Sequence, residues 1–424
     1  MIISGAVFLL LCAVGVPIAF ALGLAGAAGL LTLGEKLIIV PTRMFTGIDS
    51  FVLLAAPFYI FAGEVMNRGG VTDRLIRFSQ IVTGKVRGGT AYACTFASVL
   101  FAGISGTAIA DTAALGQVFI KGMPKEGYTK EYAAAVVIAG SVIGPIIPPS
   151  VIMVIYGAVT QISVVDLFVS GVIPGLLLGG AVRAVIAYHS RGGRLPKSTF
   201  SVRRSEVPRL ALDTFLVISL PLFIVVGTVT GAFTATEAGG VACVYSMLLG
   251  WLIFRHLNLR ELWSALTSSA RTSATLFLVV GAAMVASHFL ALSGIAEFTR
   301  GLGTIFAGHP TLFMLAVMVF LLIVGCFLDP GAAVILFVPL LLPSARAMHL
   351  DILQFSMLVN LTLTIGVITP PVGVSLFVAM RIGEIGMGKL VKQTLPFLAA
   401  EVGVVILLIL YPPFSSWLPG LLHR

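Results

Sequence analysis

The chain has 424 residues, of which 58% are hydrophobic and only 10% are charged. Soluble domains carry about 25% charged residues, so this composition excludes a water-soluble protein. Apolar runs of about 20 residues, each long enough to cross a bilayer, recur along the chain. The net charge of +9 comes from basic residues in short segments between these runs, which excludes the single basic face of a nucleic-acid-binding protein. The four cysteines show no metal-binding spacing.

The connections between apolar runs fall into two groups by their content of Lys and Arg. The basic connections are residues 67–89, 120–131, 189–209, 255–271 and 381–392. The basic-poor connections are residues 34–49, 293–310 and 343–351. Because cytoplasmic loops of membrane proteins are enriched in Lys and Arg, we predict that the first group is cytoplasmic and the second group is external.

The first 66 residues are predicted to cross the membrane three times. Residues 1–33 divide near Val16–Pro17 into two short crossings, and residues 50–66 form the third. Three crossings that lead to a cytoplasmic connection place the N-terminus outside, on the periplasmic side.

Two apolar segments are predicted to be re-entrant hairpins. Residues 90–119 have basic connections on both sides, which favours a hairpin that enters and leaves on the cytoplasmic side. Residues 312–345 have basic-poor connections on both sides, which favours a hairpin from outside. A simple pair of crossings with one misassigned connection is the alternative for each segment.

Two further apolar segments carry helix-breaking residues. Residues 144–150 read GPIIPPS; proline removes an amide donor, and a bilayer offers no water to bond the freed carbonyls. Residues 365–371, IGVITPP, repeat residues 143–149, IGPIIPP, at an offset of 222, and the same offset carries Gly103 onto Gly325. The predicted broken helices are residues 133–165 and 353–380.

Each half of the chain thus holds a hairpin followed by a broken helix, and the connection charges indicate that the halves are inverted. We predict an all-α polytopic membrane protein with about 11 transmembrane segments, built as two inverted repeats. The repeats are residues 1–210 and 211–424, each with scaffold helices, one hairpin and one broken helix. Interrupted helices at corresponding positions of inverted repeats are typical of secondary transporters and mark their binding sites.

Polar side chains near the tips and breaks are the candidates for binding. A break exposes carbonyls, which attract cations such as sodium, and half-helix N-termini, which attract anions. The candidate side chains are Ser105, Thr107, Asp111, Ser141, Ser150, Asp329, Thr362, Thr364 and Thr369. Each has a structural alternative, because aspartate often caps a helix and serine or threonine often bonds back to a carbonyl of its own helix.

Four motifs resemble the large membrane subunit of tripartite ATP-independent periplasmic (TRAP) transporters. They are ISGTAIADTAALG, IGPIIPPS, FLDPGAAVILFVPLLLP and NLTLTIGVITPPVG. The resemblance implies an elevator-type transporter of the bacterial inner membrane, whose mobile domain consists of two hairpins and two broken helices. It also implies sodium-driven import of a carboxylate that a soluble periplasmic binding protein delivers, and a small four-helix membrane subunit. Since no four-helix segment precedes residue 1, we expect that subunit to be a separate chain.

The resemblance also implies roles for individual residues, with Na+ as the only cofactor. The first sodium site would be formed by Ser105, Gly106, Thr107, Gly144 and Pro145. The second would be formed by Gly325, Asp329, Gly366 and Thr369. The anion would lie between the two tips, near Gly103, Ser105, Asp111, Ser150 and Thr364. Family members often carry a second serine where this chain has Thr107, which keeps the hydroxyl but changes its geometry.

Two other functions compete with this interpretation. Residues 103–106, GISG, fit the GxSG pattern of rhomboid proteases, with His288 as the partner of the serine. The repeat at offset 222 has no role in that mechanism, so we do not expect an enzyme. A stand-alone sodium–dicarboxylate or citrate symporter of similar architecture would need no binding protein, and uptake by this chain alone would identify it.

Overall fold

The computed structural model describes residues 2–83, 86–193, 195–198, 205–294, 301, 306 and 308–422. Every regular element within these ranges is a helix, as predicted for an all-α membrane protein. Parts of the predicted connections 67–89, 189–209 and 293–310 lie outside the described residues.

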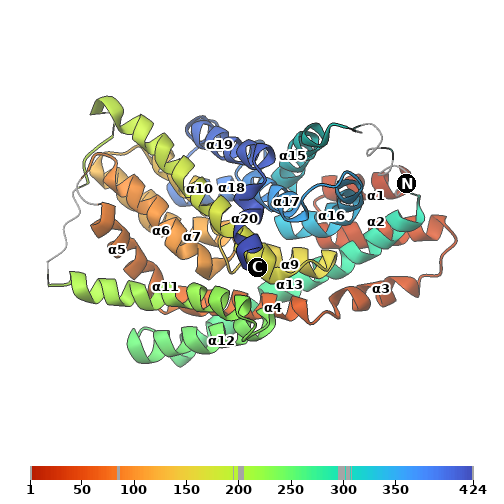
Figure 1. The fold of residues 1–424 in the computed structure, drawn as a ribbon, viewed down its shortest axis with the longest axis horizontal. Helices are drawn as coiled ribbons and strands as arrows, with labels where there is room; N and C mark the ends of the chain where they lie inside the picture. Colours follow the sequence, from red (N-terminus) through yellow and green to blue (C-terminus); the bar gives the residue numbers. More distant parts are fainter. Residues whose placement is uncertain are drawn as a thin grey trace.

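Five helices precede the first hairpin (Figure 1). They are α1 (Ile2–Ala13), α2 (Ile18–Thr32), α3 (Ile39–Ile48), α4 (Ala55–Arg68) and α5 (Val71–Thr83). The chain is interrupted between α1 and α2, near the predicted division, because Pro17 cannot continue a helix and instead stands at the N-cap of α2. The axis bends by 66° between α3 and the helical segment that begins at Val52.

The first hairpin consists of α6 (Gly89–Ser105) and α7 (Ala108–Gly122), close to the predicted range 90–119. The first broken helix consists of α8 (Lys130–Ser141) and α9 (Val151–Thr160), with GPIIPPS between them. The predicted range extends to residue 165, whereas α9 ends at Thr160 and α10 (Val164–Ser190) begins a separate helix. The side chain of Ser163 caps that helix by accepting a hydrogen bond from the amide of Asp166 at 3.3 Å.

The same order of elements returns in the second half. The connecting helices are α11 (Val207–Val229), α12 (Ala235–Leu248) with a π-helical turn (Leu249–Ile253), and α13 (Leu259–Leu292). The second hairpin is α15 (Pro310–Phe327) and α16 (Pro330–Ala347), and the second broken helix is α17 (Ile352–Gly366) and α18 (Val374–Gly383). The chain continues with α19 (Met387–Leu410) and α20 (Pro413–Leu422).

The predicted offset of 222 relates matching positions of these elements. It separates the first residues of α7 and α16, Ala108 and Pro330, and it separates Pro174 in α10 from Pro396 in α19. The order of elements therefore recurs along the chain. The inversion of the halves and their division at residue 210 stay predictions.

Seven of the described helices are long and apolar enough to cross a membrane, or eight if the bent pair of α3 and α4 counts as one span. The predicted number of about 11 segments is not confirmed. Helices α2, α9, α17 and α18 are apolar but shorter than a span, because glycine and proline interrupt the chain beside them.

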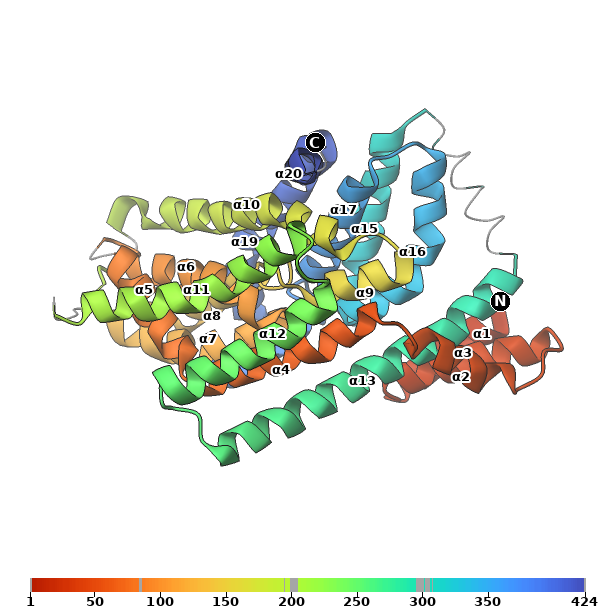
Figure 2. The same ribbon diagram turned by 60° about the horizontal axis from the view of Figure 1, so that its bottom comes forward.

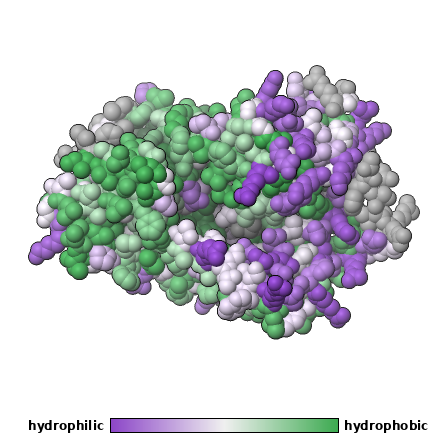
Figure 3. Space-filling model, turned by 180° about the vertical axis from the view of Figure 1, so that it is seen from behind, coloured by the Kyte–Doolittle hydropathy of each residue, from purple (hydrophilic) through white to green (hydrophobic). Residues whose placement is uncertain are grey.

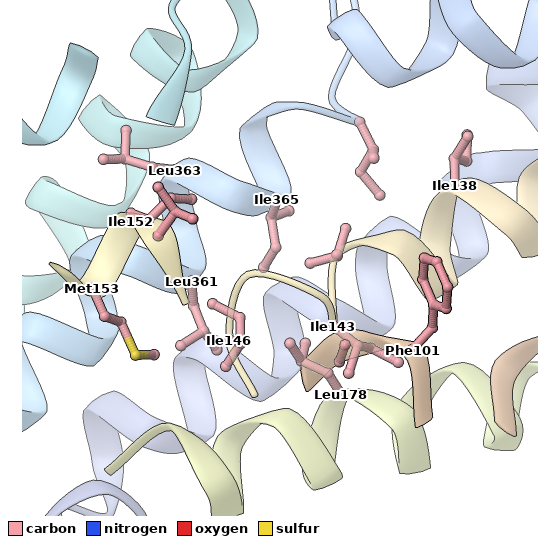
Figure 4. Close-up of a cluster of buried hydrophobic side chains, with 14 of the residues drawn as sticks. Phe101, Ile138, Ile143, Ile146, Ile152, Met153, Leu178, Leu361, Leu363 and Ile365 are labelled. Atoms are coloured by element: carbon pink, nitrogen blue, oxygen red, sulfur yellow. The ribbon is translucent and has the colours of Figure 1, made fainter. Parts of the chain in front are cut away.

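The two broken helices share one core. Ile143 and Ile146 of the first break lie in a buried apolar cluster with Leu361 and Ile365 of α17 (Figure 4). The hairpins pack around this core, with α7 against α8 and α18, and α16 against α9 and α17. Outside them, α13 runs along α2, α3, α4 and α16 and forms a long edge of the molecule (Figure 2).

The connections predicted to be cytoplasmic meet at one end of the molecule. Arg87 and Lys197 form an isolated bridge between the connections 67–89 and 189–209, where α5, α6, α10 and α11 have an end (Figure 1). Hydrophilic residues cover this end, which is on the right in the view from behind (Figure 3). The N-terminal helix and the connection between α2 and α3 lie at the opposite end.

Candidate functional site

The first hairpin turns at Gly106 and Thr107. Gly106 has a φ of +63°, in the left-handed region that favours glycine. The hydroxyl oxygen of Thr107 caps α7 by accepting a hydrogen bond from the amide of Ala110 at 3.3 Å. Ser105 is the last residue of α6, and its side chain lies outside the described part of the structure.

The tip of this hairpin lies against the first break. A Cβ atom added to Gly106 would be 3.3 Å from Cγ2 of Val151. A Cβ atom added to Gly103 would be 2.9 Å from the carbonyl oxygen of Pro148 and 2.6 Å from Cβ of Pro221 in α11. Glycine at these positions therefore allows the hairpin, the break and α11 to approach through their backbones.

Serine hydroxyl groups form hydrogen bonds with backbone groups at the first break. The Ser150 hydroxyl donates to the carbonyl oxygen of Pro145 and accepts a hydrogen bond from the amide of Met153 at 3.3 Å. It thereby caps α9 and satisfies a carbonyl that the proline-rich segment leaves without a helical partner. Ser141 bonds back to the carbonyl oxygen of Ile138 at 2.7 Å. Ser141 thus shows the structural alternative that the sequence left open, whereas Ser150 bonds a carbonyl of the break itself.

Asp111 lies behind the first tip. It stands in the first turn of α7 with 0% of its surface exposed. Its carboxylate approaches the first break so closely that a Cβ atom at Gly144 would overlap Oδ2 of Asp111. The missing side chain at Gly144 thus makes room for a carboxylate against the backbone of the break.

The second hairpin turns at Leu328 and Asp329. The carboxylate of Asp329 caps α16, since Oδ1 accepts a hydrogen bond from the amide of Gly331 at 2.9 Å, and the side chain remains exposed. Asp329 takes the capping position that Thr107 takes in the first hairpin, 222 residues earlier. The two tips therefore share a capping side chain at matching positions but differ in backbone, since Gly106 is left-handed and Leu328 is extended.

The second hairpin touches the second break through backbone atoms. A Cβ atom added to Gly366 would be 2.5 Å from Cα of Gly325. A Cβ atom added to Gly325 would be 2.8 Å from the carbonyl oxygen of Leu363. Only glycine fits at either position without moving the other helix.

The threonines near the second break bond mainly to their own helix. The hydroxyls of Thr364 and Thr369 donate to the carbonyl oxygens of Asn360 and Ile365, at 2.7 Å and 2.8 Å. The hydroxyl of Thr362 is buried and has no hydrogen-bond partner among the described residues. The geometry of Thr364 and Thr369 therefore matches the structural alternative.

A cavity of about 460 Å³ lies between the two hairpin tips and α13. Thr107 lines it from the first tip, Asp329 from the second tip, and Pro145 and Val367 from the two breaks. Most of the other lining side chains are aliphatic, including Ile60 of α4. A mainly apolar pocket with a few convergent polar groups is the usual form of a small-molecule site.

Three helices present their N-terminal residues to this cavity. They are α7 with Ala108, α9 with Val151 and α16 with Pro330. A helix N-terminus carries a partial positive charge and amide groups that no carbonyl of the helix accepts. The cavity therefore offers an environment that favours an anion.

Helix α13 forms a wall of the cavity that was not predicted from the sequence. Arg271, Thr272 and Thr275 line the cavity, whereas residues 255–271 were assigned to a cytoplasmic connection. That boundary is wrong, because residues 259–292 form one continuous helix. The absence of glycine and proline from residue 259 to residue 280 is the signal that could have extended the helix.

The expected binding residues divide into two sets. Those that line the cavity are Thr107, Pro145 and Asp329. Those that do not line it are Gly103, Gly106, Asp111, Gly144, Ser150, Gly325, Thr364, Gly366 and Thr369. The three that line the cavity all belong to the predicted sodium sites, and the sodium assignments stay predictions.

Comparison with known proteins finds relatives along nearly the whole chain. The family model described as the DctM component of the tripartite ATP-independent periplasmic transporter matches residues 6–414. The sialic acid TRAP transporter large permease protein SiaM of Vibrio cholerae is 34% identical, over 96% of this chain and 95% of that protein. The C4-dicarboxylate TRAP transporter large permease protein DctM of Pseudomonas aeruginosa is also 34% identical, over 94% of this chain and 93% of that protein.

A solved structure shares the fold at low sequence identity. The YdaH transporter of Alcanivorax borkumensis is 15% identical to this chain with a TM-score of 0.64, and the match covers 89% of each chain. The likeness shows that this arrangement of helices occurs in a membrane transporter.

Proposed function

We propose that this chain, which belongs to the family of the DctM component of tripartite ATP-independent periplasmic transporters, imports an organic acid. A sodium gradient supplies the free energy for this import. Its family and its apolar helices make it a multi-pass protein of the inner membrane. The relatives are permease subunits named for sialic acid and for C4-dicarboxylates. An organic acid is the substrate class that these names have in common.

The cavity between the two hairpin tips carries the proposal. The N-termini of α7, α9 and α16 meet there, and those of α7 and α9, which neutral side chains cap, favour negative charge. Its volume of about 460 Å³ lies within the range of small-molecule sites, about 300–1,000 Å³. The apolar lining excludes water from the carbon skeleton of a bound acid, which strengthens each polar contact inside.

Two contacts between a tip and a break support sodium coupling. Sodium prefers oxygen ligands, which broken helices supply as carbonyl groups. In the first half the carboxylate of Asp111 packs on Gly144, and in the second half Asp329 stands at the tip beside the contact of Gly325 with Gly366. The first half therefore places a carboxylate beside the backbone of the break, and carboxylate and carbonyl oxygens together are a donor set suited to a monovalent cation.

The walls of the cavity also suit an elevator mechanism. One side comes from the hairpins and broken helices, and the other comes from Ile60 of α4 and the cavity-lining residues of α13. Movement of the first set past the second would carry a bound acid across the membrane. We propose that a small four-helix membrane subunit, as a separate chain, and a periplasmic binding protein complete the transporter.

Uptake by reconstituted protein tests this function. The full chain is placed in proteoliposomes with the small subunit, and the binding protein loaded with a labelled organic acid is added outside. We expect uptake when sodium is higher outside and no uptake when choline replaces it. Sodium-independent uptake would contradict the coupling.

Omission of single components distinguishes a three-component transporter from a stand-alone symporter. We expect uptake to disappear when either the binding protein or the small subunit is left out. Sodium-driven uptake of dicarboxylate or citrate by this chain alone would instead identify a stand-alone symporter. Loss of uptake in a Gly144→Leu variant that still folds would assign transport to the broken-helix region of this chain.

A further inference from the structure

The cavity contains one side chain of each charge among the described residues that line it. Arg271 of α13 is the cation and Asp329 of the second tip is the anion. They come from different elements, because Arg271 belongs to α13 and Asp329 is the N-cap of α16. A ligand in this cavity meets a positive charge from one element and a negative charge from another.

Arg271 is available to bind a ligand. Its side chain is exposed, and the ion pairs within the described part of the chain join Arg68 to Glu64 and Glu261, and Arg74 to Asp213. A charged side chain in a largely apolar cavity costs free energy unless something pairs with it. A carboxylate is the ligand that a guanidinium group binds best, through two parallel hydrogen bonds.

The hydroxyl groups beside Arg271 add a second preference. Thr272 and Thr275 line the same wall, and each donates its proton to a backbone carbonyl of α13, that of Ser268 at 3.1 Å and that of Arg271 at 3.0 Å. With their protons engaged, both oxygens can only accept hydrogen bonds. They match a ligand that carries hydroxyl or amide donors next to its carboxylate.

Asp329 adds a restriction of its own. A second carboxylate on the ligand would face the carboxylate of Asp329, and two like charges at close range repel each other. A hydroxyl group at that end would instead donate a hydrogen bond to Asp329. The negative charge therefore discriminates against dicarboxylates.

On the basis of the proposed function, we propose that the substrate is a hydroxylated monocarboxylate, with its carboxylate bound by Arg271 and its hydroxyl end directed to Asp329. Sequence identity does not distinguish a monocarboxylate from a dicarboxylate substrate, because the relatives named for sialic acid and for C4-dicarboxylates are both 34% identical to this chain. Sialic acid has one carboxylate and several hydroxyl groups. The charges of the cavity favour that chemical class.

The first test identifies the acid that the transporter takes up. The complete transporter in proteoliposomes is offered a mixture of N-acetylneuraminate, gluconate, glucarate and succinate with a sodium gradient, and the contents are measured by mass spectrometry. We expect a hydroxylated monocarboxylate inside the vesicles. Sodium-driven uptake of glucarate or succinate would overturn this inference and leave the proposed function standing. A lack of sodium-driven uptake of any organic acid would overturn both.

The second test changes the arginine. Arg271→Gln is expected to raise the KM for the transported acid about tenfold or more, because a charge-assisted pair is lost, without changing the sodium concentration that gives half-maximal uptake. Arg271→Lys keeps the charge but loses the bidentate geometry, so we expect an intermediate KM. Arg260→Gln is the matched control, since Arg260 is an exposed arginine of the same helix that does not line the cavity. A KM in Arg271→Gln equal to that of the control would overturn the assignment.

The third test changes the charge of Asp329. Asp329→Asn keeps a side chain that can cap α16 but removes the repulsion of a second carboxylate. At saturating sodium, we expect glucarate to inhibit the uptake of gluconate or N-acetylneuraminate at least about tenfold better in this variant than in the wild type. Equal inhibition in the two proteins would show that Asp329 does not discriminate against dicarboxylates.

Discussion

At the scale of single residues, Gly366 and Gly325 are the positions where the second break depends most directly on a missing side chain. A Cβ atom at Gly366 would be 2.5 Å from the backbone of Gly325. Backbone atoms cannot relieve an overlap by changing rotamer, as a side chain can. We therefore expect Gly366→Ala to lower the free energy of unfolding by about 2–3 kcal/mol. Thermal unfolding of the purified chain in detergent measures this change.

Gly403 supplies the control for this prediction. It lies inside α19, and a Cβ atom there would have no neighbour within 4 Å. Gly403→Ala should leave the unfolding temperature unchanged or raise it, because alanine favours a helix over glycine by up to about 1 kcal/mol. Equal unfolding temperatures of the two variants would contradict the packing that the structure shows.

Asp329 offers a residue-level test of sodium binding that separates charge from capping. Asp329→Ala removes both the cap of α16, worth about 1 kcal/mol, and the negative charge. Asp329→Asn removes only the charge. We expect both variants to need a higher sodium concentration for half-maximal uptake. If Asp329→Asn keeps the sodium activation of the wild type, the carboxylate is not a sodium ligand.

The candidate residues show what a sequence can reveal about a site of this kind. Thr107 and Asp329 could be found because each stands beside a turn in an apolar run, where a polar side chain has few other reasons to occur. Arg271 could not be found in this way, because the positive charge fitted a basic connection equally well. For Ser150 and Thr369, the sequence supplied the hydroxyl but not its hydrogen-bond partner.

At the scale of elements, glycine and proline explain why the hairpins and breaks could be predicted. These residues have strong and local effects on a helix, so GPIIPPS and IGVITPP marked the two interruptions directly. The lower boundary of α13 was wrong for the opposite reason. Its first part carries basic residues, which assigned residues 255–271 to a connection, whereas the backbone from Leu259 to Leu292 forms one helix.

The ion pair between α5 and α11 gives a prediction at this scale. Arg74 Nε lies 3.0 Å from Asp213 Oδ2, both side chains are at most 15% exposed, and the guanidinium of Arg74 also stacks on Phe254 at 4.0 Å. A double-mutant cycle with Arg74→Ala and Asp213→Ala should give a coupling free energy of about 1.5–3 kcal/mol. Unfolding of the four proteins in detergent measures it.

The pair of Arg68 with Glu261 is the matched control for this cycle. It joins α4 to α13 at 3.3 Å, but its side chains are 30% and 41% exposed. Solvent screens such a pair, so we expect a coupling free energy below about 1 kcal/mol. Equal coupling in the two cycles would show that burial does not set the strength of the Arg74 pair.

At the scale of the whole molecule, the helical class and the recurring order of elements could be predicted, whereas the number of crossings could not. Composition and hydropathy identify an apolar helix, but short helices such as α2 and bent pairs such as α3 and α4 become crossings only through their packing. The arrangement of hairpins around one shared core depends on contacts far apart in the sequence. No local pattern contains that information.

The distribution of basic connections gives a prediction about orientation. Lys125 lies in an exposed position of a basic connection, and Lys36 is exposed in a basic-poor one. In a variant without the four native cysteines, Lys125→Cys should react with a membrane-impermeant maleimide only from the cytoplasmic side. Lys36→Cys should react only from outside, and labelling of both from one side would contradict the assigned orientation.

The capping residues of the two hairpins, Thr107 and Asp329, have a practical consequence for inhibitor design. They stand at matching positions of the two tips, but one is neutral and the other is acidic. Two identical caps would bind a molecule equally well in either orientation. Because these caps differ in charge, the cavity favours one orientation of a bound molecule. A selective blocker should therefore be an asymmetric compound, acidic at one end and donor-rich at the other, and joining two copies of the acidic end would weaken it.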